Sequence, residues 1–343
     1  MQSVISWVFH NNFIELFLAF FTLINVITFL LYVIDKRKAV KNKWRIKERT
    51  LIFFTLAFGG VGALLGMCIA RHKTKNKKFI FAVVLGLVIV LVPVIHIVHS
   101  ATLDRIISYT EIEFRSENWP TELDGYRIAF IADTHFISEE RLWSVVHELN
   151  ERELNLALLG GDFAWDTYKM QKTIEILSYI ETTDGIYGVE GNHDRRGLLF
   201  SKMEEREITP LSNSGVYVRE NFFLAGVEDT WRNPSIQDAL VGSQPEDFVL
   251  LISHNPDIVM RQDTADVNLI LSGHTHGGQM TFFGIWAPYF TFTTSITAYG
   301  QRFRSGWALS RDNTPVFVSN GVGEYMPRIF ARPQVILINM FSE

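Results

Sequence analysis

Two long apolar stretches constrain this chain more than any other feature. Residues 13–34 and 79–98 each reach the ~20 residues that an α-helix needs to cross a bilayer, and the second carries no charged side chain. A cleaved signal peptide is the alternative for the first stretch, but it lacks a basic leader and a small-residue cleavage site, and a second span follows. Both stretches are therefore predicted to be transmembrane helices.

The charged residues divide the chain into a basic front and an acidic rear. Residues 1–78 contain 13 Lys and Arg against 3 Asp and Glu, whereas residues 79–343 contain 19 against 34. This asymmetry indicates different surroundings for the two parts, and 343 residues suffice for about two domains. We expect an all-helical transmembrane domain over residues 1–100, followed by a second domain over residues 101–343.

A third apolar segment, residues 51–70, either spans the membrane or re-enters it. It contains four glycines, which allow close helix contact or a bend, and Cys68, the only cysteine of the chain. Eight Lys and Arg precede it in residues 35–49, and five follow it in residues 71–78. A re-entrant segment puts both basic loops in the cytoplasm and the C-terminal domain outside, whereas a full span leaves that domain inside. The positive-inside rule favours the outside placement.

The C-terminal domain is predicted to have an α/β fold. Short apolar runs that end in polar residues alternate with helical patterns at residues 138–153 and 166–180, which is typical of helices packed on a sheet. The last runs, at residues 304–310, 314–320 and 334–340, are separated only by loops and indicate a second, antiparallel sheet. We expect a two-sheet sandwich flanked by helices.

Five of the apolar runs end in side chains that are possible metal ligands. These side chains are Asp133 and His135; Asp162; Asn192, His193 and Asp194; His254; and His274 and His276. Functional groups of α/β sheets collect beyond the carboxyl ends of the strands, and residues i and i+2 of an extended backbone face the same way. Such a set suits two metal ions about 3.5–4 Å apart. Imidazole with carboxylate ligands favours Mn, Fe or Zn over Ca.

These blocks resemble a known family, the calcineurin-like metallophosphoesterases. The resemblance covers about residues 125–340 and consists of Asp-x-His (133–135), Gly-Asp (161–162), Gly-Asn-His-Asp (191–194), His254 and Gly-His-Thr-His (273–276). The following Gly-Gly-Gln (277–279) is similar to the bacterial membrane-associated branch, which includes pyrophosphatases acting on UDP-2,3-diacylglucosamine. The front half resembles a small bacterial membrane domain of unknown function through Tyr32–Lys36, Trp44–Arg45, Gly59–Gly60 and His72–Lys73.

The resemblance implies a role for each residue of the blocks. One metal would be bound by Asp133, His135 and His276, the other by Asn192, His254 and His274, with Asp162 as the bridge. His193 would stabilise the transition state or protonate the leaving oxygen, and Asp194 would orient it and raise its pKa. Phe136 departs from the small residue that is common in the family after Asp-x-His and would narrow the pocket. Arg195 and Arg328 are candidates for contact with a substrate phosphate.

Together these observations predict a multi-pass protein of the bacterial cell membrane that hydrolyses a phosphate ester or pyrophosphate by metal-hydroxide attack. The partners expected are the bilayer and a phosphorylated substrate, which the membrane anchor and the aromatic residues 281–301 suggest is a lipid. No nucleic acid is expected, and the oligomeric state stays open. Two alternatives remain: a broad phosphodiesterase or phosphomonoesterase with soluble substrates, and a non-catalytic binding platform.

Overall fold

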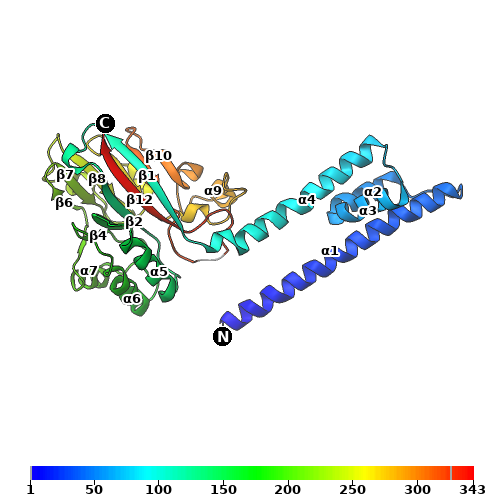
Figure 1. Ribbon diagram of the computed structural model, residues 1–343, viewed down its shortest axis with the longest axis horizontal. Coiled ribbons are helices and arrows are strands. Elements are labelled where there is room, and N and C mark those ends of the chain that lie inside the picture. The colour runs from blue at the N-terminus through cyan, green and yellow to red at the C-terminus, as the bar shows by residue number, and fades with distance from the viewer. Residues whose placement is uncertain (1, 325–326) are drawn as a thin grey trace. The chain divides into compact units, whose positions relative to one another are not determined.

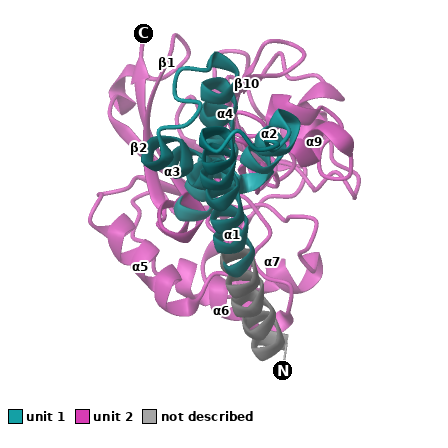
Figure 2. Cartoon of the chain, turned by 90° about the vertical axis from the view of Figure 1, so that its right-hand side faces the viewer, with its two compact units in different colours: residues 1–98 teal, residues 99–343 magenta. Residues whose placement is uncertain are grey.

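The chain forms two compact units, Met1–Val98 and His99–Glu343, which Figure 2 shows in different colours. The computed structural model describes the backbone of residues 2–324 and 327–343, and the side chains from residue 19 onward within those ranges. The first residues of the span predicted at 13–34 therefore lie outside the described side chains. Because each unit has a core of its own, the two are taken separately below.

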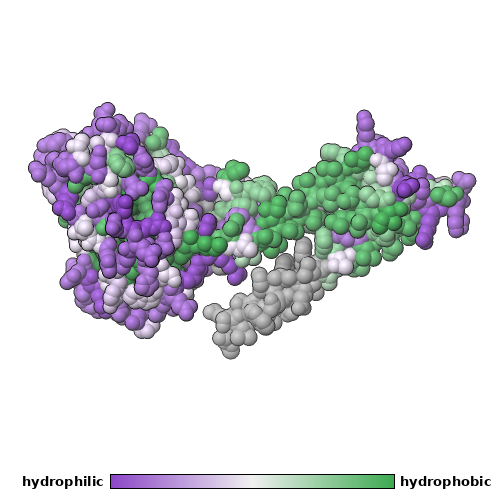
Figure 3. Space-filling view, in the orientation of Figure 1, coloured by the Kyte–Doolittle hydropathy of each residue, from purple (hydrophilic) through white to green (hydrophobic). Residues whose placement is uncertain are grey.

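In its described residues, the first unit consists of helices joined by loops (Figure 1). It consists of α1 (Gln2–Val40), α2 (Glu48–Phe54), a π-helical turn (Thr55–Gly59), α3 (Gly60–Ala70) and α4 (Lys77–Ala101). Among the described residues, three segments are long and apolar enough to cross a membrane, namely Ala19–Val40, Glu48–Ala70 and Lys77–Arg105. Figure 3 shows apolar surface along these helices and a mostly polar surface on the second unit.

The middle apolar segment doubles back on itself. Its helix breaks at Ala57 (ψ 51°) and Phe58 (φ 66°), where the backbone leaves the right-handed helical region. Glu48, at the start of α2, and Lys73, just after α3, form an ion pair with 2.5 Å between Oε1 and Nζ. Both ends of the segment therefore lie at the same end of the helical bundle. This bend is the geometry that the re-entrant alternative predicts, and re-entry into a membrane stays a prediction.

Side chains of α1 satisfy the backbone groups that this break exposes. The Asn25 amide donates to the carbonyl of Phe58 at 3.0 Å, and its oxygen accepts from the Gly62 N–H at 2.7 Å. In an apolar layer such groups have no water to bond with, so an internal partner stabilises the bend. Gly60 permits the close crossing with α4, because a Cβ there would lie 2.5 Å from the carbonyl carbon of Gly86.

A buried carboxylate joins the two basic loops. Asp35 has no exposed surface and accepts hydrogen bonds from the Arg45 guanidinium (2.8 Å), the Ile46 N–H (2.9 Å) and His72 Nε2 (2.7 Å). Arg45 belongs to the loop before α2, and His72 belongs to the loop after α3. The two loops, residues 41–47 and 71–76, are thus held together on one side of the unit.

The second unit contains two mixed six-stranded sheets. The first has the order β1-β12-β2-β3-β4-β5, with strands Ser108–Ser116, Gln334–Ser342, Tyr126–Ile131, Leu156–Leu159, Ile186–Gly188 and Ile208–Pro210. The second has the order β10-β11-β9-β8-β7-β6, with strands Gly306–Leu309, Pro315–Val318, Leu269–Ser272, Phe248–Ile252, Phe222–Gly226 and Ser214–Arg219. Strands β2 to β5 run parallel to one another, as do β7, β8, β9 and β11.

Alternating side chains of these strands build the layers of a sandwich. Along β2, Ile128 and Phe130 point into the core between the sheets, where they join Leu224 and Leu250 of the second sheet. The intervening Ala129 and Ile131 face the helices on the other side. These helices are α5 (Glu139–Asn150), α6 (Thr167–Leu177) and α7 (Arg196–Glu204), and Figure 1 shows them beside the first sheet. A third core and the short helix α8 (Ile236–Ala239) cover the outer face of the second sheet.

The prediction of a separate sheet for the C-terminal strands is wrong. They were expected to form a separate antiparallel sheet, but β12 lies within the first sheet, parallel to β1 and antiparallel to β2. Strands β10 and β11 extend the second sheet, of which β11 pairs in parallel with β9. The apolar run Val335–Ile338 explains the central place of β12, since a strand covered on both faces needs no polar alternation.

Candidate metal centre

Both sheets contribute strand ends to one polar centre. Asp133, Asp162 and Asn192 follow β2, β3 and β4 of the first sheet, and His254 and His274 follow β8 and β9 of the second. All of these strands run in the same sense within their sheets, so that their carboxyl ends lie at one edge. This edge is where an α/β sheet offers side chains and backbone N–H groups to a ligand.

One group of possible ligands consists of Asp133, His135 and His276, whose ligand atoms all lie within 4.8 Å of one another. The Nε2 atoms of His135 and His276 are 3.0 Å apart, and His276 Nε2 lies 3.8 Å from Asp133 Oδ1. Asp133 has no exposed surface. An oxygen and two nitrogens aimed at one point form three sides of a coordination shell for a divalent transition metal.

A second group lies beside it and consists of Asp162, His254 and His274, again within 4.8 Å. His254 Nε2 is 3.3 Å from Asp162 Oδ2 and 3.1 Å from His274 Nδ1. The amide oxygen of Asn192 lies 3.2 Å from the same His254 nitrogen, so it faces this group as well. The structure thus brings all seven side chains that were predicted as ligands into one centre, in which Asn192, His274 and His276 are partly exposed.

The backbone at this centre is held in an uncommon conformation. Asp133, Asp162, His274 and His276 have φ values of 53°, 57°, 71° and 49°, in the left-handed region that residues other than glycine seldom adopt. Such angles persist where surrounding contacts fix them, and they cluster at functional sites. Here the contacts include the N–H of His274, which donates to Asp133 Oδ2 at 2.9 Å, and that of His193, which donates to Asp162 Oδ1 at 2.8 Å.

Outer hydrogen bonds orient two of the imidazoles. His254 Nδ1–H donates to the carbonyl of Gly160 at 2.8 Å, which leaves Nε2 facing Asp162. His274 Nε2–H donates to the carbonyl of Ile296 at 3.0 Å, which leaves Nδ1 toward His254. A metal-ligating histidine usually donates its other ring N–H in this way, and the bond fixes both the tautomer and the ring direction.

Burial and neighbouring charges set the protonation of the centre. Burial lowers the pKa of His135 to about 4 and, together with the charge of His254, lowers that of His274 to about 4. Burial and the nearby Arg328 guanidinium lower the pKa of His276 well below its usual value. These imidazoles are therefore neutral near pH 7, which is the form that binds metals.

The pKa values of His254 and Asp162 are shifted in opposite directions. Burial alone would lower the pKa of His254, but the Asp162 carboxylate raises it well above the usual value. Burial alone would raise the pKa of Asp162, but His254 lowers it. Burial raises the pKa of Asp133 to about 7. A cation at the centre would take over the role of the His254 proton beside Asp162, so metal binding and proton release are linked there.

His193 and Asp194 are placed differently from one another. The His193 side chain is exposed, and its ring stacks on Trp165 with centroids 4.2 Å apart. Asp194 was expected to orient that imidazole, but its buried carboxylate accepts from the backbone N–H groups of Asp162 (2.7 Å), Phe163 (2.9 Å) and Gly191 (2.8 Å). Asp194 therefore ties the loops after β3 and β4 together, because these N–H groups would otherwise be buried without acceptors.

The two candidate arginines also differ in their surroundings. Arg195 is exposed, and its guanidinium donates to Thr167 Oγ1 at 3.4 Å. Arg328 is fully buried, donates to the carbonyls of Asn320 (2.9 Å) and Ala331 (2.9 Å), and lies 3.4 Å from His276 Nδ1. Its guanidinium thus holds the loop behind the first group of ligands, and burial lowers its pKa to about 10.

Trp165 is a residue of the centre that sequence reasoning missed. Its indole N–H donates to His135 Nδ1 at 2.6 Å, while its ring stacks on His193. Phe136 lies beside it, with ring centroids 5.7 Å apart, and is 44% exposed. Trp165 follows Asp162 by only three residues, but a lone tryptophan in a loop carries no spacing signal from which its direction could be predicted.

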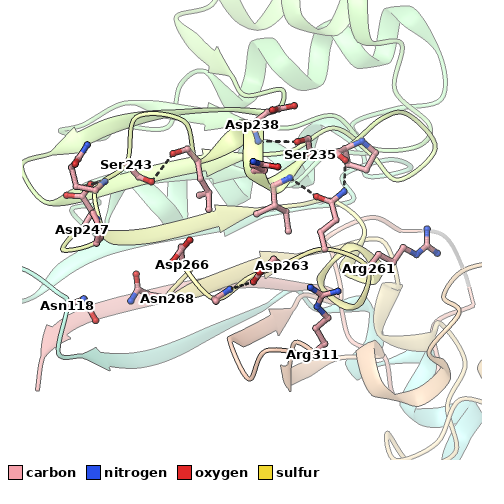
Figure 4. A pocket seen from close by; sticks show the side chains of 18 of the residues that line it. Asn118, Ser235, Asp238, Ser243, Asp247, Arg261, Asp263, Asp266, Asn268 and Arg311 are labelled. Atoms are coloured by element: carbon pink, nitrogen blue, oxygen red, sulfur yellow. Dashed lines mark hydrogen bonds between the residues drawn. The ribbon is translucent and has the colours of Figure 1, made fainter.

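A large hollow of the second unit lies away from this centre. It has a volume of about 1130 Å³ and is lined by polar residues that include Asp247 and Asn268, which directly precede β8 and β9 (Figure 4). The candidate ligands His254 and His274 follow the opposite ends of the same strands. The hollow and the metal centre are thus separate features.

The fold and the centre define a metal-dependent phosphoric ester hydrolase. Residues 126–278 match the model of the calcineurin-like phosphoesterase family, and residues 25–79 match a family described as a protein of unknown function, DUF1294. The chain thus contains a calcineurin-like phosphoesterase domain that follows an N-terminal DUF1294 region.

Curated relatives match the two units separately and together. A "transmembrane protein with metallophosphoesterase domain" of Danio rerio is 26% identical over 83% of this chain and 69% of its own length. The "phosphodiesterase YaeI" of Escherichia coli is 26% identical over 63% of this chain and 82% of its own. The "uncharacterized protein YsdA" of Bacillus subtilis is 48% identical over 21% of this chain and 80% of its own.

Proposed function

We propose that the chain is a membrane-anchored hydrolase with two divalent ions at the centre described above. Asp133, His135 and His276 would hold one ion, and Asn192, His254 and His274 the other, with Asp162 between them. The observation that carries this proposal is the meeting of two three-residue groups, each within 4.8 Å, at strand ends of both sheets. Imidazole and carboxylate ligands fit Mn, Fe or Zn.

The residues around the centre support hydrolysis of a phosphoryl bond. Two ions held by these side chains supply an activated water and neutralise charge on the phosphate oxygens. Asp162, with its lowered pKa, remains a carboxylate and can serve both groups of ligands. The backbone N–H of His193 donates to this carboxylate, and the exposed imidazole of the same residue would donate a proton to the departing oxygen. Trp165 would hold that imidazole in place by stacking.

We infer that the substrate is a phosphate ester or pyrophosphate linked to a lipid. Support comes from the covalent attachment of the hydrolase domain, residues 101–343, to membrane helices in residues 1–100, and from the Gly-Gly-Gln block of the pyrophosphatase-like branch. The relative from Escherichia coli carries the name phosphodiesterase, which supports ester hydrolysis in general. A soluble phosphodiester or monoester is the second candidate substrate. For such a substrate the anchor would only localise the enzyme to the membrane.

We further propose that the hydrolase domain lies outside a bacterial cytoplasm. Both basic loops lie on one side of the first unit, and only α1 and α4 are left to cross the membrane in full. The positive-inside rule places those loops in the cytoplasm. The chain then leaves α4 on the opposite side.

The experiment that tests the activity uses the purified full chain in detergent with Mn. We expect hydrolysis of methyl p-nitrophenyl phosphate that a chelator abolishes and added Mn restores. His254→Ala should lose one bound ion per chain, measured by metal analysis, together with the activity. Full metal content in this variant, or activity without metal, would refute the assignment; a metal-loaded wild type without activity would favour the non-catalytic binding platform.

A further inference from the structure

A row of apolar side chains stands exposed beside the metal centre. Met280, Ile285, Trp286, Tyr289 and Phe292, here called the aromatic rim, lie in one stretch of the chain, and Ile285 and Phe292 are 79% and 80% exposed. Exposed apolar groups of this size, gathered in one stretch, are unusual on a domain surrounded by water. Tryptophan and tyrosine are also the residues enriched at the boundary between a bilayer and water.

The aromatic rim is held in a defined shape. The N–H of Phe282 donates to the carbonyl of Trp286 at 2.7 Å, and Arg304 donates to the carbonyl of Gly284 at 2.6 Å. Gln301 donates to the carbonyl of Ala287 at 2.7 Å and so fixes the start of α9 (Pro288–Phe292). These bonds satisfy the backbone while the apolar side chains remain outside, so the exposure is a built feature of the loop.

The same stretch begins and ends at the metal centre. Met280 follows His276 by four residues, and the carbonyl of Ile296 accepts the hydrogen bond that orients His274. Arg304 also donates to the carbonyl of Gly277 at 3.1 Å, so it joins the loop of the ligands to the loop of the aromatic rim. A surface that binds the aromatic rim would therefore lie next to the metal centre.

The chain enters this domain from a membrane helix at a neighbouring point. The ring of His99, in the last turn of α4, stacks on Phe330 with centroids 3.7 Å apart, and Asp104 accepts from the Phe330 N–H at 2.8 Å. Phe330 in turn packs against Phe283, within the loop of the aromatic rim, at 5.4 Å between centroids. All four residues belong to the second unit.

The bilayer surface must lie close to His99. The apolar part of α4 runs directly into His99, so the residues that follow are at the level of the lipid headgroups. Leu103 and Ile106, the next apolar side chains, are 46% and 52% exposed. Since His99 and Asp104 are packed on the loop that contacts the aromatic rim, the rim is restricted to the neighbourhood of that surface.

We propose that the aromatic rim, with Leu103 and Ile106, docks into the leaflet from which α4 emerges and presents the metal centre to phosphates in the headgroup layer. The occupant of this surface is the bilayer of the protein's own membrane. The proposal rests on the proposed function for its substrate, a lipid phosphate. The position of the aromatic rim in the leaflet is tested by a measurement that needs no enzymatic activity.

The first experiment locates Ile285 directly. Cys68 is the only cysteine, so Cys68→Ala gives a background for nitroxide labels at Ile285→Cys and, as a control, at Val241→Cys, an apolar side chain that is 73% exposed. In the full chain reconstituted in lipid nanodiscs, the label at 285 should be relaxed by oxygen more than by a water-soluble nickel complex, and the label at 241 should show the reverse. Equal behaviour of the two labels would overturn the proposal. A label at 285 shielded from both reagents would do so too, since it would indicate a protein partner.

The second experiment uses two substrates with the same leaving group, methyl p-nitrophenyl phosphate in solution and hexadecyl p-nitrophenyl phosphate in the nanodiscs. The double variant Ile285→Glu, Phe292→Glu should lose at least tenfold on the lipid substrate and stay within twofold on the soluble one. Equal effects on both substrates would contradict docking. Failure of the wild type on both substrates would count against the proposed function, while the labels would still decide the position of the aromatic rim.

Discussion

The indole N–H of Trp165 donates a hydrogen bond to Nδ1 of His135, with 2.6 Å between the two nitrogens. The opposite nitrogen of that imidazole, Nε2, is the one that faces His276 and the first group of ligands. A neutral imidazole that accepts at Nδ1 carries its proton on Nε2, whereas an imidazole that binds a metal through Nε2 carries it on Nδ1. The contact with Trp165 and ligation by Nε2 are therefore mutually exclusive.

This competition predicts that Trp165→Phe strengthens metal binding. The variant has no indole N–H to displace, so affinity for Mn at the first group of ligands should rise about two- to tenfold, from a hydrogen bond worth about 0.5–1.5 kcal/mol. Titration calorimetry of the purified chain measures it, with Trp44→Phe, a 96% exposed tryptophan, as the control. Unchanged or weaker binding in Trp165→Phe alone would show that the contact does not compete.

Asp194 is predicted to act on stability rather than on proton transfer. Asp194→Asn places an amide against three buried N–H donors and should lower the free energy of unfolding by about 1.5–3 kcal/mol, since hydrogen bonds to a charged group are lost. Thermal unfolding in detergent measures the change. Asp238→Asn, at an exposed carboxylate, is the control. If Asp194→Asn melts with the wild type yet loses activity, the role in orienting His193 that was expected from the sequence would be the better account.

His193 is predicted to matter most when the leaving group is poor. His193→Ala should reduce kcat about 10²–10⁴-fold on an alkyl phosphodiester, which needs a proton on the departing oxygen, and far less on a p-nitrophenyl ester. Metal content should remain at two ions per chain, because this imidazole is exposed and belongs to neither group of ligands. An equal loss on both substrates would contradict proton donation.

The middle segment, residues 51–70, doubles back as a helical hairpin. This hairpin predicts that both basic loops lie on the same side of the membrane. On the Cys68→Ala background, cysteines at Lys43 and Lys75 should react with an impermeant maleimide only after cells are permeabilised, because both loops lie on the same side. A cysteine at Val241 should react in intact cells. Reaction of Lys43→Cys and Lys75→Cys from opposite sides would exclude the hairpin, and protection of all three sites would exclude the outside placement.

Much of the polar centre could be predicted because its side chains follow apolar strands. A run such as LNLALLGGD predicts both a strand and the polar residue at its end. Parallel pairing of neighbouring strands then brings Asp133, Asp162 and Asn192 together. The pairing of ions with particular ligands stays a prediction. The partners of Asp194 and Trp165 could not be foreseen, because they depend on loop geometry that local pattern does not encode.

Long-range pairing limited the prediction of the fold. Strand β12 is adjacent in sequence to β11 but pairs with β1 and β2, more than 200 residues away, so proximity along the chain gave the wrong sheet. The middle membrane segment was undecided by length and hydropathy, which are those of a full span. The contacts of Asn25 with both sides of its break account for the bend, and these depend on packing against α1.

The most direct test of the two-metal account compares the purified wild type with Asp162→Asn on methyl p-nitrophenyl phosphate with Mn. Asp162 belongs to the second group of ligands and is the carboxylate that we propose both ions share, and two-metal catalysis supplies several kcal/mol of transition-state stabilisation. The account predicts at least a ~100-fold loss of Mn-dependent hydrolysis in Asp162→Asn, with Asp263→Asn, at an exposed carboxylate, unaffected. Hydrolysis in Asp162→Asn at the wild-type rate would contradict it.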